Sequence, residues 1–260
     1  MDYFQKYSSF TDLFVIPLNA QKINLLTRYF HFLMEEAMPR GFIGKAAEET
    51  IWVRHILDSL LILQKKEVCE ILLNSELIID LGSGAGLPGI PLSILLPERK
   101  FFLIDSMKKR IDFLEKIKQE LNLQNVDLLF KRIEEIEYTD IAVLKDTSKK
   151  VVLFRAFLKP LVSLEMALHV LTKNSKVLYW RSRRFDVSDT FDKENNSFFS
   201  QVNARVEESG FKILQFYNLV CPEELHLRGV YLIDYTGRLN DKYPRRWNKI
   251  KKDQLINKIE

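Results

Sequence analysis

The chain contains, from residue 78 to residue 86, the sequence Ile78-Ile79-Asp80-Leu81-Gly82-Ser83-Gly84-Ala85-Gly86. Its apolar start predicts a short buried strand over 77–81, and the residues after the glycines predict a helix that ends near 96. Gly82 allows a sharp turn from strand to helix, and Gly84 lets a ligand approach the backbone closely. A glycine-rich turn between a strand and a helix is typical of proteins that bind nucleotides.

The spacing of the glycines separates two kinds of cofactor. A dinucleotide fingerprint requires its third glycine three residues after the second, where this chain has Leu87; the third glycine is instead Gly86. Asp80, two residues before the first glycine, would repel a pyrophosphate but suits a ligand with a cationic head. S-adenosylmethionine carries a sulfonium and an ammonium and no phosphate. The electrostatics therefore favour this cofactor over NAD, and leave an NAD-dependent oxidoreductase as the disfavoured alternative.

A second acidic residue, Asp105, ends the next apolar strand, 23 residues after Gly82. An acid at this distance is typical of sites that hold the two hydroxyls of a ribose. The alternative is a plain turn with an exposed Asp105. The strand, Asp80, the three glycines and Asp105 together favour a cofactor site.

Short apolar strands alternate with helical segments along most of the chain. Residues 1–75 are predicted to be helical, and a closing antiparallel pair is predicted over 211–219 and 225–234. Between them, strands are predicted over 77–81, 100–104, 126–130, 151–154 and 176–180, with helices over 107–121 and 160–171. This order predicts an α/β fold of the Rossmann-like kind, with a seven-stranded, mostly parallel sheet. We expect a helical extension over 1–75, a main domain over 76–236 and a basic tail over 237–260.

Composition excludes several classes of protein. Apolar residues make up 47% of the chain and charged residues 28%, which is enough apolar surface for a core and argues against disorder. The longest uncharged run, Leu81–Pro97, holds four glycines and three prolines and is no membrane span. No signal peptide is recognised, so Cys69 and Cys221 are expected to be reduced thiols in a cytoplasmic protein. No tight group of cysteine and histidine predicts a metal.

The positive charge is concentrated at the carboxyl end. Residues 238–260 carry eight basic and three acidic side chains, whereas the rest of the chain has a net charge of −1. A basic tail is typical of proteins that contact phosphate backbones. A solvated chain end is the alternative interpretation.

The motifs around the glycine loop resemble one family. IDLGSGAGLPGIPLSILLPERKFFLIDSMKKRIDFL, over 79–114, is similar to the bacterial small-subunit (16S) ribosomal RNA guanine-N7 methyltransferase family, also called glucose-inhibited division protein B. VRHILDSL at 53–60, RIEE at 132–135, RAF at 155–157 and KYPRR at 242–246 match as well. The family's Asn-Leu-Thr, however, is replaced here by MPRGFIGK at 38–45, and its Lys-Gly after the fifth strand by Arg181 and a serine.

The resemblance implies a class I methyltransferase fold with a helical N-terminal extension. It implies transfer of a methyl group from S-adenosylmethionine to N7 of one guanine in 16S ribosomal RNA. By motif, the cofactor contacts fall on Gly82, Leu87, Ile133, Glu134 and Arg155. The physical argument above adds Asp80, Gly84, Gly86 and Asp105 to this set.

Methylation at N7 places few demands on the enzyme, because this nitrogen has an exposed lone pair and no proton to lose. No general base is expected, and the chain has no Asn-Pro-Pro-Tyr or Asp-Pro-Pro-Tyr segment and no Pro-Cys pair. Catalysis must come from positioning. Arg155, at the end of a predicted strand, is the candidate positioning residue, contacting either the cofactor or O6 of guanine. A salt bridge at a strand end is the alternative.

His55, Asp58 and Ser59 share one helical face, which we interpret as a cover over the cofactor pocket. The alternative is a solvated face on which Arg54 and Asp58 pair, and a catalytic base role for His55 is not supported. The expected RNA contacts are basic residues after the fifth strand and in the tail: Arg181, Arg183, Arg184, Lys242, Arg245, Arg246 and Lys249.

The expected partner is 16S ribosomal RNA, the small ribosomal subunit or an assembly intermediate, and the protein is expected to be a monomer. Two rival functions remain at this point. One is a class I methyltransferase with a non-RNA acceptor, and the other is a non-catalytic RNA-binding or ribosome-assembly protein.

Overall fold

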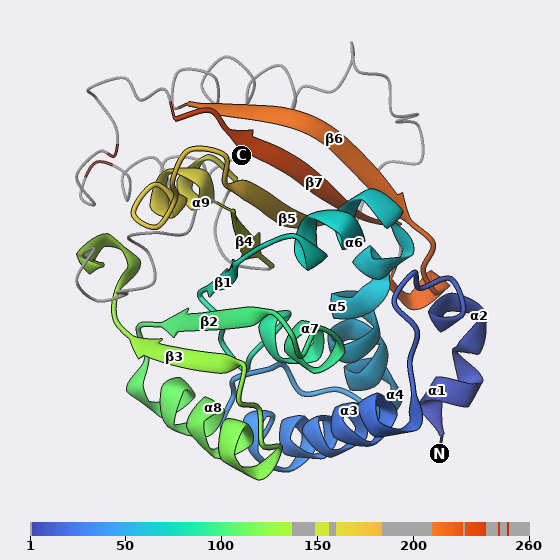
Figure 1. Ribbon diagram of the computed structural model, residues 1–260. Coiled ribbons are helices and arrows are strands. Elements are labelled where there is room, and N and C mark those ends of the chain that lie inside the picture. Colours follow the sequence, from blue (N-terminus) through green and yellow to red (C-terminus); the bar gives the residue numbers. More distant parts are fainter. Residues whose placement is uncertain are drawn as a thin grey trace.

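A computed structural model describes residues 2–136, 149–155, 160–183, 210–225 and 227–237, with Pro244 and Lys249 (Figure 1). In this part of the chain one sheet has the strand order β3-β2-β1-β4-β5-β7-β6. Its strands are β1 (Leu77–Leu81), β2 (Lys100–Asp105), β3 (Val126–Phe130), β4 (Lys150–Phe154), β5 (Lys176–Arg183), β6 (Phe211–Leu219) and β7 (Leu227–Tyr235). The first five strands are parallel, and β7 runs antiparallel to both β5 and β6. This is the arrangement of a class I methyltransferase, so the predicted fold is confirmed.

Helices cover both faces of the sheet. They are α1 (Tyr3–Lys6), α2 (Ser8–Thr11), α3 (Ala20–Phe32), α4 (Glu48–Ile51), α5 (Asp58–Leu60), α6 (Lys66–Leu73), α7 (Gly89–Leu95), α8 (Lys108–Glu120) and α9 (Pro160–Ala167). Between α4 and α5 the helix widens to a π-helical stretch, Trp52–Leu57. Two elements differ in length from the prediction. The helix predicted over 160–171 ends earlier, at Ala167, and the strand predicted over 176–180 extends to Arg183.

Two hydrophobic cores lie on opposite faces of the sheet, because successive side chains of a strand point to opposite sides. In β1, Ile78 packs in the larger core together with α3, α7, α8 and the π-helical stretch. Leu77 and Ile79 pack in the other core, against α9. Figure 1 shows α3 beside α8 and α4–α5 beside α7. The N-terminal helices therefore share one core with the sheet.

The turns at the carboxyl ends of β1 and β2 hold each other in place. The amide of Gly82 donates to the carbonyl of Ile104 at 2.9 Å, and the Asp105 carboxylate accepts from Met107, the residue before α8. The helices that follow these turns, α7 and α8, thus start from one connected loop system. Within the described residues, no helix is long and apolar enough to cross a bilayer, and no cluster of acidic, histidine or cysteine side chains could hold a metal ion.

Candidate functional site

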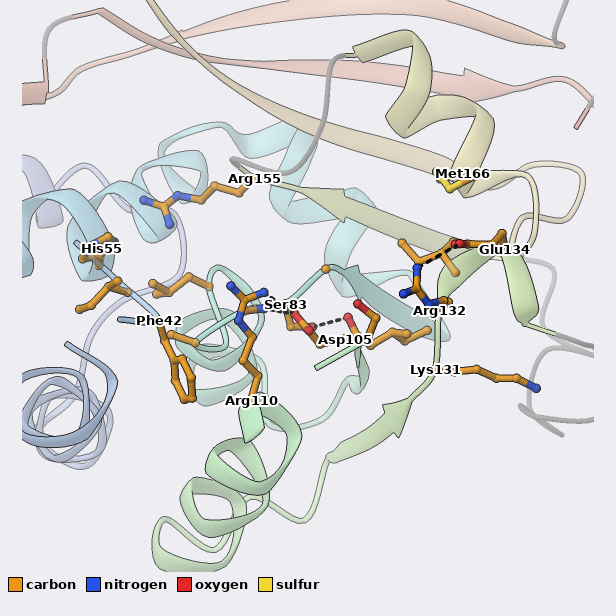
Figure 2. Close-up of a pocket in the computed structure, with 18 of the residues that line it drawn as sticks. Phe42, His55, Ser83, Asp105, Arg110, Lys131, Arg132, Glu134, Arg155 and Met166 are labelled. Carbon is orange, nitrogen blue, oxygen red and sulfur yellow. Dashed lines mark hydrogen bonds and ion pairs between the residues drawn. The ribbon is translucent and has the colours of Figure 1, made fainter. Parts of the chain in front are cut away.

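A cavity of about 590 Å³ lies at the carboxyl ends of β1, β2 and β4 (Figure 2). Ligands bind at this edge of open parallel sheets. Its lining comes from segments far apart in the chain: Phe42, Ile43, Gly44, His55, Gly82, Ser83, Gly84, Ala85, Leu87, Ile104, Asp105, Ser106, Arg110, Lys131, Arg132, Ile133, Glu134, Arg155 and Met166. The structure therefore brings together Gly82, Gly84, Leu87, Asp105, Ile133, Glu134 and Arg155 of the predicted cofactor contacts.

The glycine loop presents bare backbone to this cavity. Gly82 and Gly84 have φ angles of +74° and +58°, which side chains with a Cβ rarely adopt. A Cβ at Gly84 would meet only the Gly82 carbonyl oxygen, at 3.9 Å. It would project into space that a ligand could otherwise fill. The loop therefore has the form of a cradle for a cofactor.

Gly86 and Asp80 support the loop from behind, and are not among the described residues that line the cavity. A Cβ at Gly86 would lie 2.6 Å from Ile90 Cγ1 and 2.8 Å from Leu114 Cδ2, so this glycine permits close packing. Asp80 is 1% exposed, and its Oδ2 accepts from the Gly89 amide at 2.8 Å, at the start of α7. The structure gives both residues a structural role, and their predicted contacts with a cofactor stay predictions.

Burial also changes the charge of Asp80. Loss of solvation raises the pKa of its carboxyl to about 7, although the Gly89 hydrogen bond and the Arg155 charge oppose the rise. The sequence argument assumed an ionised Asp80 facing the ligand, whereas the folded chain places the group in a site that disfavours ionisation.

Asp105 lies in the cavity where a ribose contact was predicted, and its carboxylate already accepts three hydrogen bonds. Oδ2 accepts from the Gly84 amide at 2.9 Å and from Arg110 Nη1 at 3.2 Å. Oδ1 accepts from the Met107 amide at 2.8 Å. The carboxylate thus fixes the loop, the start of α8 and one arginine.

The far end of the cavity follows β3. A short 3-10 turn, Ile133–Glu135, places a buried Ile133 and the carboxylate of Glu134 on the cavity wall. Arg132 Nη1 lies 3.7 Å from Glu134 Oε1. This end combines an apolar surface with an acid, as the family resemblance implied.

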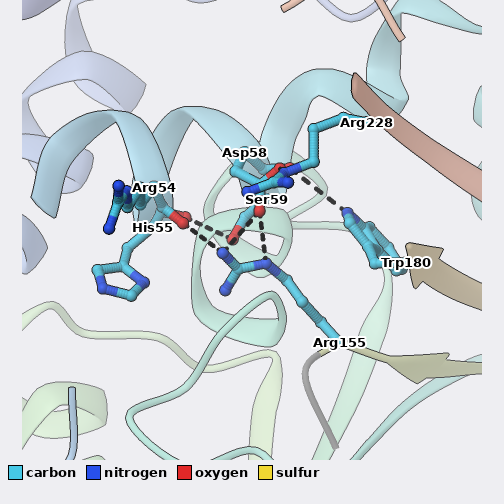
Figure 3. A network of polar contacts seen from close by, with 7 residues as sticks. All are labelled: Arg54, His55, Asp58, Ser59, Arg155, Trp180 and Arg228. Carbon is cyan, nitrogen blue, oxygen red and sulfur yellow. Dashed lines mark hydrogen bonds and ion pairs between the residues drawn. The ribbon is translucent and has the colours of Figure 1, made fainter. Parts of the chain in front are cut away.

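Arg155 is held by a buried ion-pair network (Figure 3). Its Nε and Nη2 donate to Asp58 Oδ2 at 3.0 and 2.7 Å, and Nη2 also donates to the Arg54 carbonyl. Arg228 Nε donates to Asp58 Oδ1 at 2.9 Å, and Trp180 Nε1 to the Asp58 carbonyl at 3.4 Å. Asp58 is thus enclosed between two arginines. The simple pairing of Arg54 with Asp58 that the sequence left open is replaced by this longer-range network.

Of the three residues expected to cover the pocket, His55 lines it, whereas Asp58 and Ser59 lie behind it. Ser59 is buried and donates to the His55 carbonyl at 2.6 Å. Burial, with the Arg155 charge as a second cause, lowers the pKa of His55 to about 3. Its Nδ1 is buried without a hydrogen-bond partner among the described residues. His55 is therefore uncharged and weakly basic near neutral pH.

The predicted RNA contacts are largely untested by the described structure. Arg181 is half-buried, and its Nη1 donates to the Tyr231 hydroxyl at 3.4 Å. Arg183 is the last residue of β5, and Lys249 is exposed. The other four, Arg184, Lys242, Arg245 and Arg246, lie outside the described residues.

Several lining residues were not anticipated. Phe42, Ile43 and Gly44 come from the segment that departs from the family pattern, and Phe42 packs edge-on against Phe113 with ring centroids 5.7 Å apart. Ser83, Arg110, Arg132 and Met166 were also missed, as was Arg228 in the network behind the cavity. Arg110 carried a detectable signal, because it lies in the first turn of the helix that follows Asp105.

A family model described as rRNA small subunit methyltransferase G matches residues 22–213. Proteins named ribosomal RNA small subunit methyltransferase G are similar to the chain. The Carboxydothermus hydrogenoformans protein is 37% identical over 50% of this chain, an alignment that spans only 54% of that relative. The Mycoplasma capricolum protein is 27% identical over 96% of both chains. The Fusobacterium nucleatum protein is 31% identical over 89% of this chain and 90% of its own length.

The family model covers most of the chain, and the similarity to the Fusobacterium protein spans nearly all of it. These matches include the glycine loop, Asp105, the 3-10 turn and Arg155, which together form the cavity. The chain therefore belongs to the rRNA small subunit methyltransferase G family.

Proposed function

We propose that the protein transfers a methyl group from S-adenosylmethionine to N7 of one guanine in 16S ribosomal RNA. The observation that carries the proposal is the cavity over Gly82–Gly84, with Asp105 on its wall, in a chain of this family. We propose the naked RNA, the small ribosomal subunit or an assembly intermediate as the partner, and the cytoplasm as the location.

The residues present fit the cofactor. The cavity volume, about 590 Å³, is within the ~300–1,000 Å³ that small-molecule sites usually have. Gly84 leaves room for a ligand against the backbone, and Leu87 and Ile133 supply apolar wall. Asp105 and Glu134 supply acceptors for hydroxyl and amine donors. When bound, S-adenosylmethionine would supply an electrophilic methyl group on a cationic sulfur.

The state of His55 supports an acceptor that needs no base. His55 contributes an imidazole to the cavity wall, and its pKa of about 3 makes this imidazole a poor proton acceptor. A guanine N7 has no proton to lose, so this environment suits it. An exocyclic amine, which must lose a proton, would need a group other than His55 to accept it.

Arg155 is proposed to position the guanine. Asp58 accepts hydrogen bonds from two of its guanidinium nitrogens, and the Arg155 side chain is only 11% exposed. The orientation of Arg155 is therefore fixed before a substrate arrives. O6 of guanine is an acceptor that the remaining guanidinium nitrogen, Nη1, can recognise. A bond to N7 would block the attack, so O6 or the cofactor is the proposed target. Asp58 then acts through Arg155, as a positioning residue.

The remaining contacts are proposed from the family pattern and from charge. Phosphate contacts are proposed for the basic residues after the fifth strand and in the tail, where the positive charge of the chain is concentrated: Arg181, Arg183 and Arg184, and Lys242, Arg245, Arg246 and Lys249 of the tail. The cofactor contacts proposed are Gly82, Gly84, Leu87, Asp105, Ile133, Glu134 and Arg155. The division into a helical extension, a main domain and a tail is kept as a proposal.

A genetic comparison tests the proposal. Small-subunit RNA from cells with and without the protein is digested and its modified nucleosides are identified and mapped. We expect one 7-methylguanosine to be lost without the protein and restored by the wild-type chain. An unchanged set of modifications would contradict the proposal, and would favour a non-RNA acceptor or a non-catalytic assembly role.

An Asp105→Ala variant connects the modification to the cavity. Losing a hydrogen bond to a charged group should weaken S-adenosylmethionine binding by ~1–3 kcal/mol, which calorimetric titration would measure. Lys108→Gln is the control, because Lys108 is exposed at the start of α8, three residues after Asp105, and pairs with Asp112 rather than lining the cavity. Unchanged affinity in Asp105→Ala would show that the cofactor lies elsewhere.

A further inference from the structure

Arg110 occupies the position that the ribose is expected to take. It rises from the first turn of α8 into the cavity, and Figure 2 shows its guanidinium at the Asp105 carboxylate. Nη1 lies 3.2 Å from Asp105 Oδ2. The Arg110 side chain is 30% exposed, whereas that of Asp105 is 3% exposed. Arg110 Nε is buried without a hydrogen-bond partner among the described residues. The hydrogen-bonding capacity of the Arg110 guanidinium is therefore only partly used in this position.

The acceptor capacity of Asp105 creates a conflict. A carboxylate has about four lone-pair positions, and three are taken by Gly84, Met107 and Arg110. Two ribose hydroxyls need two positions. The Gly84 and Met107 donors are backbone amides fixed by the loop and by α8, whereas Arg110 has a flexible stem. Arg110 is thus the donor that must leave Asp105 when the cofactor binds.

The other cations on the cavity wall have partners that a ribose bound at Asp105 would not displace. Arg155 is gripped by Asp58 and the Arg54 carbonyl, and Arg132 lies beside Glu134. Lys131 has interactions of its own. Among the described cations on this wall, Arg110 is therefore the one whose partner is claimed by the cofactor itself. The amino-acid end of S-adenosylmethionine carries a carboxylate that needs a cationic donor.

We propose that Arg110 exchanges the Asp105 carboxylate for the amino-acid carboxylate of the cofactor. Arg110 holds Asp105 in the free protein, and in the complex it recognises the end of the ligand that adenosine alone lacks. The inference rests on the proposed function and adds to it a residue that selects an amino-acid-bearing nucleoside.

The test compares two ligands that differ at the amino-acid end. S-adenosylhomocysteine has the amino acid, and 5′-methylthioadenosine keeps the adenosine and the thioether without it. By calorimetric titration, Arg110→Gln should bind S-adenosylhomocysteine about tenfold to a hundredfold more weakly. It should bind 5′-methylthioadenosine as tightly as the wild type or more tightly, because Asp105 is no longer occupied.

Lys108→Gln is again the matched control, since it removes a charge from the same helix turn without reaching the cavity; both affinities should stay unchanged. Equal weakening of both ligands in Arg110→Gln, or no weakening of S-adenosylhomocysteine, would overturn the exchange. If the wild type binds neither ligand, the proposed function itself fails.

A measurement on the wild-type chain removes any dependence on how the glutamine variant folds. The carboxamide of S-adenosylhomocysteine lacks the negative charge, and it should bind the wild type at least about tenfold more weakly than the parent compound. Equal affinities for the two compounds would overturn the proposal without any substitution.

Discussion

His55 shows how burial decides what a cavity residue can do. An unperturbed histidine titrates near pH 6.5 and is the usual general base, but burial and the Arg155 charge lower the pKa of this one to about 3. The imidazole therefore stays neutral throughout the physiological range. Its contribution is shape rather than proton transfer.

The first prediction concerns the pH dependence of the chemical step. Because His55 stays uncharged between pH 6 and 8 and guanine N7 has no proton to lose, the single-turnover rate should be nearly constant over that range in an Asp80→Asn background, which removes the carboxyl that titrates near 7. Rapid-quench measurement on the saturated enzyme checks this. A sigmoidal profile that disappears in a His55→Gln variant would show that the histidine takes a proton.

Asp80 gives a prediction for stability. Its pKa is raised from 3.8 to about 7 in the folded chain, so the folded state binds the proton more tightly than the unfolded state. The contribution of Asp80 to the free energy of unfolding is thus greatest below about pH 4, and this contribution is lost as the pH rises through 7. Asp80→Asn mimics the protonated form and does not titrate.

The stability advantage of Asp80→Asn over the wild type should therefore grow between pH 4 and 7, to on the order of 4 kcal/mol, and then level off. Denaturant titrations at several pH values measure it. Cofactor affinity should change little, since Asp80 contacts Gly89 rather than the cavity. A difference that shrinks as the pH rises would contradict this account of Asp80.

At the scale of the element, the glycine loop combines two tasks in adjacent residues. Gly84 leaves space for a ligand, whereas Gly86 leaves space for Ile90 and Leu114. The sequence pattern alone treated both as cofactor residues. The distinction depends on which side of the loop each Cβ would point to, and only packing partners distant in the chain reveal it.

A pair of alanine substitutions separates these tasks. Gly84→Ala should cost about 1–2 kcal/mol of stability for its backbone conformation, and it should mainly reduce cofactor affinity. Gly86→Ala adds a clash in a packed core and should cost more than about 2 kcal/mol, with unfolding as the main effect. Thermal denaturation and calorimetric titration compare the two. A larger loss of stability in Gly84→Ala, or a larger loss of cofactor affinity in Gly86→Ala, would refute this division of tasks between the two glycines.

The elements most accurately predicted are those with a local signal. β1, β3 and β6 agree with their predicted bounds to the residue, because an apolar segment between turns marks each one. β5 extends three residues further than predicted, since its end pairs with β7, where Arg183 lies opposite Leu227. The pairing of Asp58 with Arg155, 97 residues away, has no local signal at all.

At the scale of the molecule, the cavity depends on the N-terminal helices as much as on the sheet. Trp52, Tyr29 and Leu60 pack in the same core as Ile78 of β1. This packing holds His55 and the segment Phe42–Gly44 over the cofactor site. The sequence predicted such a cover on His55, Asp58 and Ser59; His55 lines the cavity, whereas Asp58 and Ser59, just after the π-helical stretch, lie behind it.

Charge distribution gives a prediction for the whole molecule. Under the proposed function, the net charge of +5 over 238–260, against −1 elsewhere, leads us to expect that the tail supplies much of the attraction to RNA. Binding should therefore weaken steeply with salt. Replacing Arg245 and Arg246 with glutamine should reduce the slope of log affinity against log salt by up to about two, with cofactor affinity unchanged. Filter binding over a salt series measures the slope, and an unaltered slope would exclude these two residues from phosphate contact.

The most direct test of the central claim is transfer of an isotopically labelled methyl group in vitro. The purified protein is incubated with labelled S-adenosylmethionine and small-subunit RNA, or intact small subunits, from cells that lack it. The RNA is then digested and its nucleosides are analysed by mass spectrometry. We predict labelled 7-methylguanosine from a single position. Label on another atom or another molecule, or no label although the cofactor is bound, would contradict the account.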